Sequence, residues 1–248
     1  MGYIRKWWDT PYARVVEEYH TREKPPPEGR GKRRKPTPEE MAAANKRVKE
    51  RNARLLIMAN FREEDYYITL TYRKEDRPEE LEECKKHFRS FIRKVQYAYR
   101  KAGEELKWMR NIEKGSRGGI HIHMILNRIP DTDVIIRRAW KYGGVHTALL
   151  YADGGFKKLA EYMTKEGKRK AGKDEEGEES GKESSYSTSR NLKRPKPNTK
   201  KMSGKTFREK IRIPEGYTLD KESSYEGING YTGYPYRYYT LLTNRRRE

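Results

Sequence analysis

Cysteine is almost absent from this sequence of 248 residues, in which Cys84 is the only one. A single thiol excludes an internal disulfide and a zinc site built from cysteines. Long apolar runs are also missing, so the sequence predicts no membrane-spanning helix. The first residues, MGYIRKWWDT, contain no apolar stretch of the kind that a secretory signal needs. We therefore expect a cytoplasmic protein that has no membrane partner.

Hydrophobic residues are scarce, at 33% of the chain, whereas 38% of the residues are charged. A core made from about half of the chain is the most that this composition supports. The charge is unbalanced, with a formal net charge of +20 and a pI near 9.8. Nucleic acid is the usual partner of so basic a protein, and the 19 tyrosines and 4 tryptophans suit stacking on unpaired bases. The composition alone does not separate an enzyme from a binding protein.

Residues 1–60 are predicted to form a basic amino-terminal arm that contains one helix. Residues 24–38 (KPPPEGRGKRRKPTP) are rich in proline, glycine and basic side chains, which favours an extended segment. Thr37 and Pro38 are a good amino-terminal cap and first position for a helix over residues 38–58.

Residues 61–166 carry the periodic patterns of a folded domain. Strands are predicted at 66–72, 106–113, 119–126 and 145–150, the second and third joined by a glycine-containing turn at 114–118. Helices are predicted from residue 78 to Gly103, from about 132 to Trp140 and from Phe156 to Lys165. This order predicts an α+β fold with a ferredoxin-like, split βαβ arrangement, in which helices pack mainly on one face of an antiparallel sheet.

The rest of the chain is predicted to lie outside that domain. Residues 167–185 are charged and of low complexity, so we expect a flexible loop. Residues 186–248 form a basic, tyrosine-rich extension that is a candidate to complete the sheet, with a further strand predicted at 211–213.

The sharpest chemical pattern is the pair His121 and His123. On a strand, residues two apart point to the same face, so the two imidazoles would lie side by side, with aliphatic residues facing the other way. Two such histidines suit a divalent metal ion, although two structural histidines are the plainer alternative. Glu113 ends the preceding strand and is the candidate for a third ligand; its alternative is a solvated strand end.

A candidate nucleophile follows one helix and one strand later. Tyr162 and Lys165 are three residues apart on the last predicted helix and would share a face. A nearby ammonium group favours the phenolate form of a tyrosine and can neutralise charge on a phosphate. This Tyr-x-x-Lys pattern gains its weight from its position after the histidines, because a tyrosine beside a lysine at a surface is common.

Together these motifs resemble those of HUH-type rolling-circle replication initiators. The resemblance rests on the strand Ile68–Tyr72 (ITLTY), the segment GGIHIHMIL and the Tyr-x-x-Lys helix. Trp140 before Gly143-Gly144, and residues 186–190 (YSTSR), are similar to the single-tyrosine initiators of phages, plasmids and bacterial mobile elements. The resemblance covers about residues 66–195, and Glu at positions 161 and 166 leaves no second tyrosine for a two-tyrosine mechanism.

The resemblance implies a role for each of these residues. His121, His123 and Glu113 would hold Mg²⁺ or Mn²⁺, Tyr162 would be the nucleophile that forms a 5′-phosphotyrosine, and Lys165 would assist it. Thr69 and Thr71 would lie near the DNA. We also expect basic side chains near these motifs to bind DNA phosphates, namely Arg117, Lys158, Arg190, Lys193 and Arg194.

The expected function is therefore metal-dependent, site-specific nicking and joining of single-stranded DNA in rolling-circle replication. The expected partners are single-stranded DNA or an origin hairpin, with a host helicase as a further candidate. A conjugative relaxase and a single-tyrosine transposase use the same chemistry and remain alternatives. A non-catalytic, basic nucleic-acid-binding protein with a structural metal site is the alternative from a different class.

Overall fold

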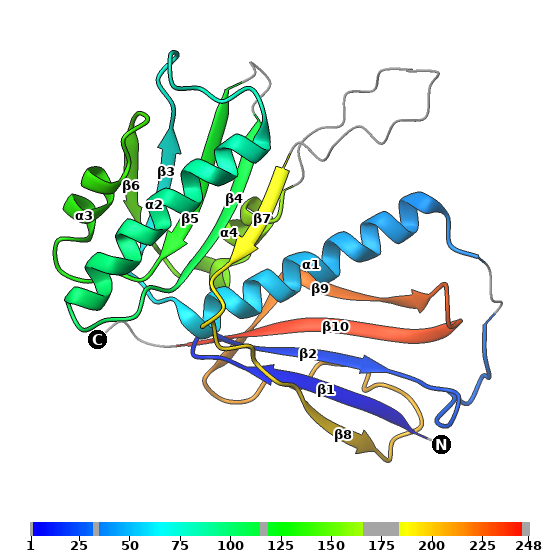
Figure 1. Ribbon diagram of the computed structural model, residues 1–248. Helices are drawn as coiled ribbons and strands as arrows, with labels where there is room; N and C mark the ends of the chain where they lie inside the picture. The colour runs from blue at the N-terminus through cyan, green and yellow to red at the C-terminus, as the bar shows by residue number, and fades with distance from the viewer. Residues whose placement is uncertain (1, 32–34, 115–118, 166–183, 245–248) are drawn as a thin grey trace, which may run out of the picture. The chain divides into compact units, whose positions relative to one another are not determined.

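The computed structural model describes residues 2–31, 35–114, 119–165 and 184–244. The chain divides into two compact units (Figure 1). Unit 1 combines residues 1–59, 152–160 and 193–248, and unit 2 combines residues 60–151 and 161–192. Each unit has a five-stranded antiparallel sheet of its own, which confirms the predicted α+β class. Within the described ranges, no helix is long and apolar enough to cross a membrane.

Unit 2 contains the predicted ferredoxin-like arrangement. Its elements are β3 (Tyr66–Thr71), α2 (Leu81–Lys101), β4 (Trp108–Lys114), β5 (Ile120–Leu126), α3 (Thr132–Ala139), β6 (Val145–Leu149) and β7 (Ser184–Thr188). The strand order is β6-β3-β5-β4-β7, and every neighbouring pair is antiparallel. Because β5 lies between β3 and β4, these two run parallel and α2 connects them, which is the split βαβ unit.

One face of the unit 2 sheet is apolar and lies under the helices. Ile68, Leu70, Ile112 and Ile122 on the strands are fully buried, and they belong to one core with the apolar stripe of α2. That stripe comprises Cys84, Phe88, Phe91, Ile92, Val95 and Tyr99. Helices α2 and α3 both cover this face (Figure 1). The period of two along each strand therefore sends the alternate side chains to the opposite face.

The turn between α3 and β6 packs closely against the end of β3. The Trp140 indole donates a hydrogen bond to the carbonyl oxygen of Thr71, with Nε1 and O 3.0 Å apart. The Thr71 amide in turn donates to the carbonyl oxygen of Gly144 at 3.0 Å. A Cβ atom on Gly143 would overlap the Thr71 carbonyl oxygen and lie 2.8 Å from the Arg73 amide nitrogen. Glycine is needed at position 143 because the two backbones approach so closely.

Unit 1 is built from both ends of the chain. Its elements are β1 (Tyr3–Asp9), β2 (Ala13–Tyr19), α1 (Pro38–Asn60), the short 3-10 helix η1 (Asp153–Phe156), β8 (Asn198–Met202), β9 (Tyr217–Asn229) and β10 (Tyr234–Thr243). The strand order is β8-β1-β2-β10-β9. The boundary between the units falls within α4 (Lys157–Met163).

The structure differs here from the predicted domain organisation. Residues 1–60 are not a separate arm, because β1 and β2 are interior strands of the unit 1 sheet. Of the extension 186–248, only β7 joins the unit 2 sheet, while β8, β9 and β10 belong to unit 1. The strand predicted at 211–213 is wrong, since this segment is irregular and Ile211 packs against the core of unit 1. The loop predicted at 167–185 lies mostly outside the described residues.

A buried arginine joins parts of unit 1 that lie far apart in the sequence. Arg54 on α1 is 3% exposed, donates to the carbonyl oxygens of Gly154 and Gly155 at 2.6 and 2.9 Å, and pairs with Asp220 at 3.1 Å. Its guanidinium therefore ties three separate segments of the chain to one another. A guanidinium with five donors suits this position, where several buried oxygens need partners.

We expect Gly143→Ala to lower the free energy of unfolding by about 1–3 kcal/mol, because the added methyl group must displace the backbone of β3. Thermal and denaturant unfolding measure this change. Gly230→Ala is the matched control, since a Cβ atom there meets no atom within 4 Å. Equal stability of the two variants would contradict the close approach at Gly143.

Candidate active site

The strand register gathers the predicted motif residues on the face of the unit 2 sheet opposite α2. On the central strand β5, His121 pairs across the sheet with Thr71 of β3 and Glu113 of β4. Two residues further on, His123 pairs with Thr69 and Asn111. Directly opposed residues project to the same face. The pairing places Glu113 beside His121, as the hairpin pattern predicts.

His123 lies at the centre of this face and has hydrogen-bond partners at both ring nitrogens. Its Nδ1 is 2.8 Å from the Tyr67 hydroxyl oxygen and 3.2 Å from that of Thr69. Its Nε2 is 3.0 Å from the hydroxyl oxygen of Tyr162. His123 is 8% exposed, and burial lowers its pKa to about 4. The imidazole is therefore neutral at pH 7, so one nitrogen donates a hydrogen bond and the other accepts one.

Hydroxyl groups lie at both ring nitrogens of His123. Those of Tyr67 and Thr69 lie at Nδ1, and that of Tyr162 lies nearer to Nε2 than to Nδ1. Because a hydroxyl group can donate or accept, these contacts fit either tautomer. The Tyr67 ring also stacks on the His123 ring, with 6.1 Å between centroids and 10° between planes. Burial raises the pKa of Tyr67, so it stays a phenol. These contacts fix the orientation of the His123 ring.

Tyr162 reaches His123 from the last turn of α4. Its ring meets the His123 ring edge-on, with 4.9 Å between centroids and 83° between planes. Tyr162 is 36% exposed, so a residue with a defined hydrogen-bond partner also has access to solvent. Asn111 anchors this end of the helix, because its Nδ2 donates to the carbonyl oxygen of Lys165 at 3.1 Å. A nucleophile needs both a fixed position and room for its substrate.

Lys165 and Glu113 form an ion pair beside the tyrosine. The Lys165 Nζ atom is 3.0 Å from Glu113 Oε1 and 6.0 Å from the centre of the Tyr162 ring. The hydrogen bond and the charge of Glu113 raise the pKa of Lys165, which keeps its side chain cationic. The carboxylate also faces His123, with 3.9 Å between Glu113 Oε2 and His123 Nε2. The predicted nucleophile, its lysine and two predicted ligands therefore lie in one cluster.

The donor set suits a divalent metal ion, although its side chains are turned to other partners. Two imidazoles and a carboxylate on adjacent strands match the ligands that Mn²⁺ and Mg²⁺ accept. Two neighbouring donors of one ion lie about 3 Å apart, somewhat less than the 3.9 Å between Glu113 and His123. No group of three His, Cys, Asp or Glu side chains within the described part of the chain is already arranged as a metal site. A metal ion bound through His123 Nε2 would replace the Tyr162 hydroxyl at that nitrogen.

The other residues predicted to bind DNA are less closely grouped. Thr71 shares the row of His121, and its hydroxyl lies 3.4 Å from the Gly144 carbonyl oxygen. The basic candidates with described positions are exposed: Arg190 in unit 2, and Lys158, Lys193 and Arg194 in unit 1. Arg117 lies outside the described residues. The structure thus places the two threonines beside the histidines and leaves the roles of the basic residues as predictions.

Three residues beside the motif residues were not predicted from the sequence. Tyr67 and Asn111 contact the cluster directly, and His146 on β6 pairs across the sheet with Thr69. Tyr67 lies two residues before Thr69, so alternation along the predicted strand could have placed it on the same face. The sequence gives no such indication for Asn111 and His146, because only the pairing of the strands places them beside the motif residues.

Comparison with protein families gives one match. Residues 65–167 match the family described as replication-associated protein ORF2/G2P. The matched segment includes β3, β5 and α4, and with them His121, His123 and Tyr162. The predicted resemblance to replication initiators is therefore confirmed over this segment. No curated protein and no solved structure matches the chain.

Proposed function

We propose that this protein is a rolling-circle replication initiator that nicks and rejoins single-stranded DNA through Tyr162. The family match of residues 65–167 supports a role in replication initiation. The observation that carries the chemical proposal is the 3.0 Å contact between the Tyr162 hydroxyl and His123 Nε2, beside the Glu113–Lys165 pair. A partly exposed tyrosine whose hydroxyl lies next to potential metal ligands and a cation is suited to attack on a phosphodiester.

The proposed step exchanges one phosphodiester bond for another. The Tyr162 oxygen attacks the scissile phosphorus in line, a bond from phosphorus to this oxygen forms, and the bond from phosphorus to the 3′ oxygen breaks. Tyr162 loses its phenol proton to solvent water, and the 3′ oxygen takes up one proton from Lys165 or water, so the step involves no net change in protons. The products are a 5′-phosphotyrosine and a free 3′-hydroxyl group. Because the ester is retained, the reverse attack by a 3′-hydroxyl rejoins the strand.

The neighbouring residues take supporting roles in this proposal. His121, His123 and Glu113 would hold Mg²⁺ or Mn²⁺, an ion that polarises a non-bridging phosphate oxygen when bound. Lys165 would offset negative charge on the phosphate or supply a proton to the 3′ oxygen. Tyr67 and Thr69 act as positioning residues, because their hydroxyls hold Nδ1 of His123 and leave Nε2 facing the nucleophile.

Removal of the Tyr162 hydroxyl tests the proposed nucleophile. Wild-type protein, incubated with Mn²⁺ and circular single-stranded DNA that carries its gene's flanking sequence, is expected to nick the circle and form a covalent adduct. Tyr162→Phe is expected to form none, because it lacks the attacking oxygen. A denaturing gel separates adduct from free DNA.

Tyr97→Phe is the matched control for this experiment, since Tyr97 is an exposed tyrosine of the same unit, on α2. It is expected to behave as wild type. An adduct that still forms with Tyr162→Phe would show that another tyrosine is the nucleophile. DNA binding without nicking by any version, over several DNA regions, would favour the non-catalytic alternative.

A second prediction concerns the orientation of His123. The double variant Tyr67→Phe/Thr69→Val removes both oxygens at Nδ1, so we expect Mn²⁺ affinity to fall by about 10- to 100-fold. Isothermal titration calorimetry measures this affinity directly. His121→Ala is the positive comparison, because it removes a proposed ligand.

His146→Ala is the matched control for this titration. It removes an exposed histidine that lies in the same row of the sheet as His123 but two strands away. Its affinity should equal that of wild type. Unchanged affinity in the Tyr67/Thr69 double variant would refute the positioning role, and unchanged affinity in His121→Ala would refute the ligand set.

A further inference from the structure

Unit 1 carries most of the positive charge of the chain. It contains 31 Lys and Arg residues against 15 Asp and Glu, which amounts to +16 of the formal net charge of +20. Almost all of unit 1 lies outside the segment that matches the replication-associated family. An excess of this size in a unit without the proposed nucleophile indicates an anionic partner of its own.

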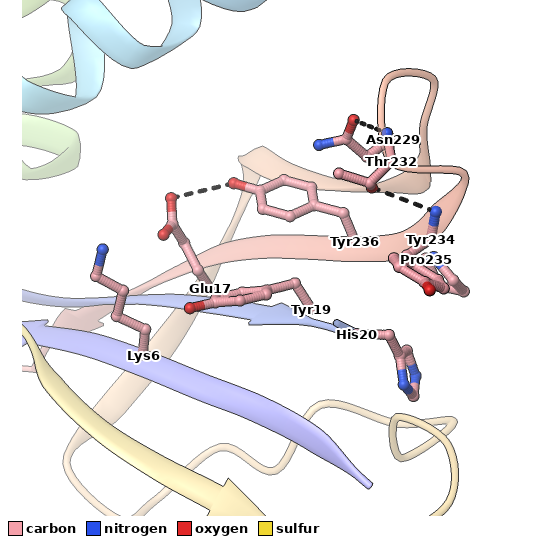
Figure 2. Close-up of a pocket in the computed structure, with 9 residues that line it drawn as sticks. All are labelled: Lys6, Glu17, Tyr19, His20, Asn229, Thr232, Tyr234, Pro235 and Tyr236. Atoms are coloured by element: carbon pink, nitrogen blue, oxygen red, sulfur yellow. Dashed lines mark hydrogen bonds between the residues drawn. The ribbon is translucent and has the colours of Figure 1, made fainter. Parts of the chain in front are cut away.

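One face of the unit 1 sheet has a hollow with aromatic walls. The hollow has a volume of about 220 Å³ and is lined by Lys6, Glu17, Tyr19, Asn229, Thr232 and Tyr236, among others (Figure 2). Tyr19 on β2 and Tyr236 on β10 are directly opposed in the sheet, so both half-buried side chains project to this face. The volume is below the roughly 300–1,000 Å³ of pockets that enclose drug-sized ligands, and suits one flat ring.

Positively charged side chains surround the tyrosines on the same face. Lys6 lines the hollow, and exposed Lys201 on β8 projects to this face because it pairs with Ile4, the partner of Tyr19. From α1, the Arg47 guanidinium lies 4.8 Å from the centre of the Tyr225 ring, and that ring lies 6.5 Å from the ring of Tyr236. We call Lys6, Tyr19, Lys201, Tyr225 and Tyr236 the tyrosine face.

The carboxylate in the hollow is already neutralised. Glu17 pairs closely with Arg51 and accepts a hydrogen bond from the Tyr236 hydroxyl at 3.2 Å. Burial, followed by the nearby charge of Arg51, lowers the pKa of Lys6. A phosphate group near Lys6 would favour its charged form, whereas a cationic ligand would disfavour it.

We propose that the tyrosine face is a second DNA-binding site, which takes unpaired bases of single-stranded DNA. Bases would stack on Tyr19 and Tyr236, and the phosphates next to them would lie by Lys6 and Lys201. Aromatic rings between cations are the common design of sites for single strands, and a duplex would keep its bases away from such rings. The choice of DNA over RNA rests on the proposed function, because the same chain would nick DNA.

Such a site would hold the strand independently of the chemistry at Tyr162. Stacking is tolerant of sequence, since every base has a flat face, so this site would contribute affinity and leave the choice of nick position to unit 2. The binding should weaken steeply with salt, because the phosphate contacts release counterions.

The test measures binding apart from nicking, in full-length protein that carries Tyr162→Phe. The probe is a fluorescein-labelled 20-residue oligothymidine, followed by fluorescence anisotropy. Tyr19→Leu/Tyr236→Leu, which removes both rings, is expected to bind about tenfold more weakly or worse. Tyr19→Phe/Tyr236→Phe keeps the rings and is expected to bind within about twofold of its parent. Equal affinity of the Leu and Phe pairs would overturn the proposal.

Two exposed lysines provide a matched test that does not disturb packing. Lys201 projects to the same face of the sheet as Tyr19, while its neighbour Lys200 on the same edge strand pairs with Arg5 and points to the opposite face. Lys201→Glu is expected to weaken binding several-fold more than Lys200→Glu, although both change the net charge equally. Equal effects of the two substitutions would indicate general electrostatic attraction to DNA and would contradict a specific binding site at the tyrosine face.

Photochemical crosslinking separates this proposal from that of nicking. An oligonucleotide with 5-bromouracil is expected to crosslink to peptides that contain Tyr19 or Tyr236, in a protein that cannot nick. Crosslinks confined to unit 2 would overturn the second site and leave the role of Tyr162 intact. If crosslinks form at the tyrosine face and Tyr162→Phe still nicks as well as wild type, the assignment of Tyr162 as nucleophile is wrong and the second site stands. Preferred binding of an RNA or duplex competitor would overturn the assignment to single-stranded DNA.

Discussion

The register of three antiparallel strands determines the candidate site. Because β5 pairs with β3 on one side and β4 on the other, His121 and His123 each receive a neighbour from both strands. A shift of one residue in either pairing would send a whole set of side chains to the apolar face under α2. The burial of Ile122 between the two histidines opposes such a shift. The same hydrophobic core that stabilises unit 2 therefore fixes the positions of the polar residues.

The proposed metal ligands and the proposed catalytic residues contact one another on this face. The Tyr162 hydroxyl contacts His123 Nε2, and Lys165 pairs with Glu113, so two groups that would act on DNA engage two groups that would bind metal. Metal binding would have to replace both contacts, and it would free Tyr162 for a phosphate. The nucleophile and the ligands are thus linked by competition for the same atoms.

Local patterns predicted unit 2 well and unit 1 poorly. The two-residue period of β5 and the spacing of three and four residues along α2 are patterns of residues close together in the sequence. The sheet, its helices and the paired histidines were therefore predicted correctly. The unit 1 sheet depends on contacts between distant parts of the chain: Tyr236 lies 219 residues after Glu17. Charged residues also interrupt its strands, as in β9 (YTLDKESSYEGIN), and no local alternation marks them as strands. Asn111 was missed for a related reason, because only the pairing of β4 with β5 places it beside His123.

The central claim, that Tyr162 becomes linked to DNA, is tested most directly by identifying the linked residue. The adduct formed with Mn²⁺ would be digested with trypsin and nuclease, and the modified peptide sequenced by mass spectrometry. We predict a nucleotide joined through its 5′ phosphate to the tyrosine of the peptide 159–165 (LAEYMTK). A nucleotide on any other tyrosine, or one joined through its 3′ phosphate, would contradict the mechanism.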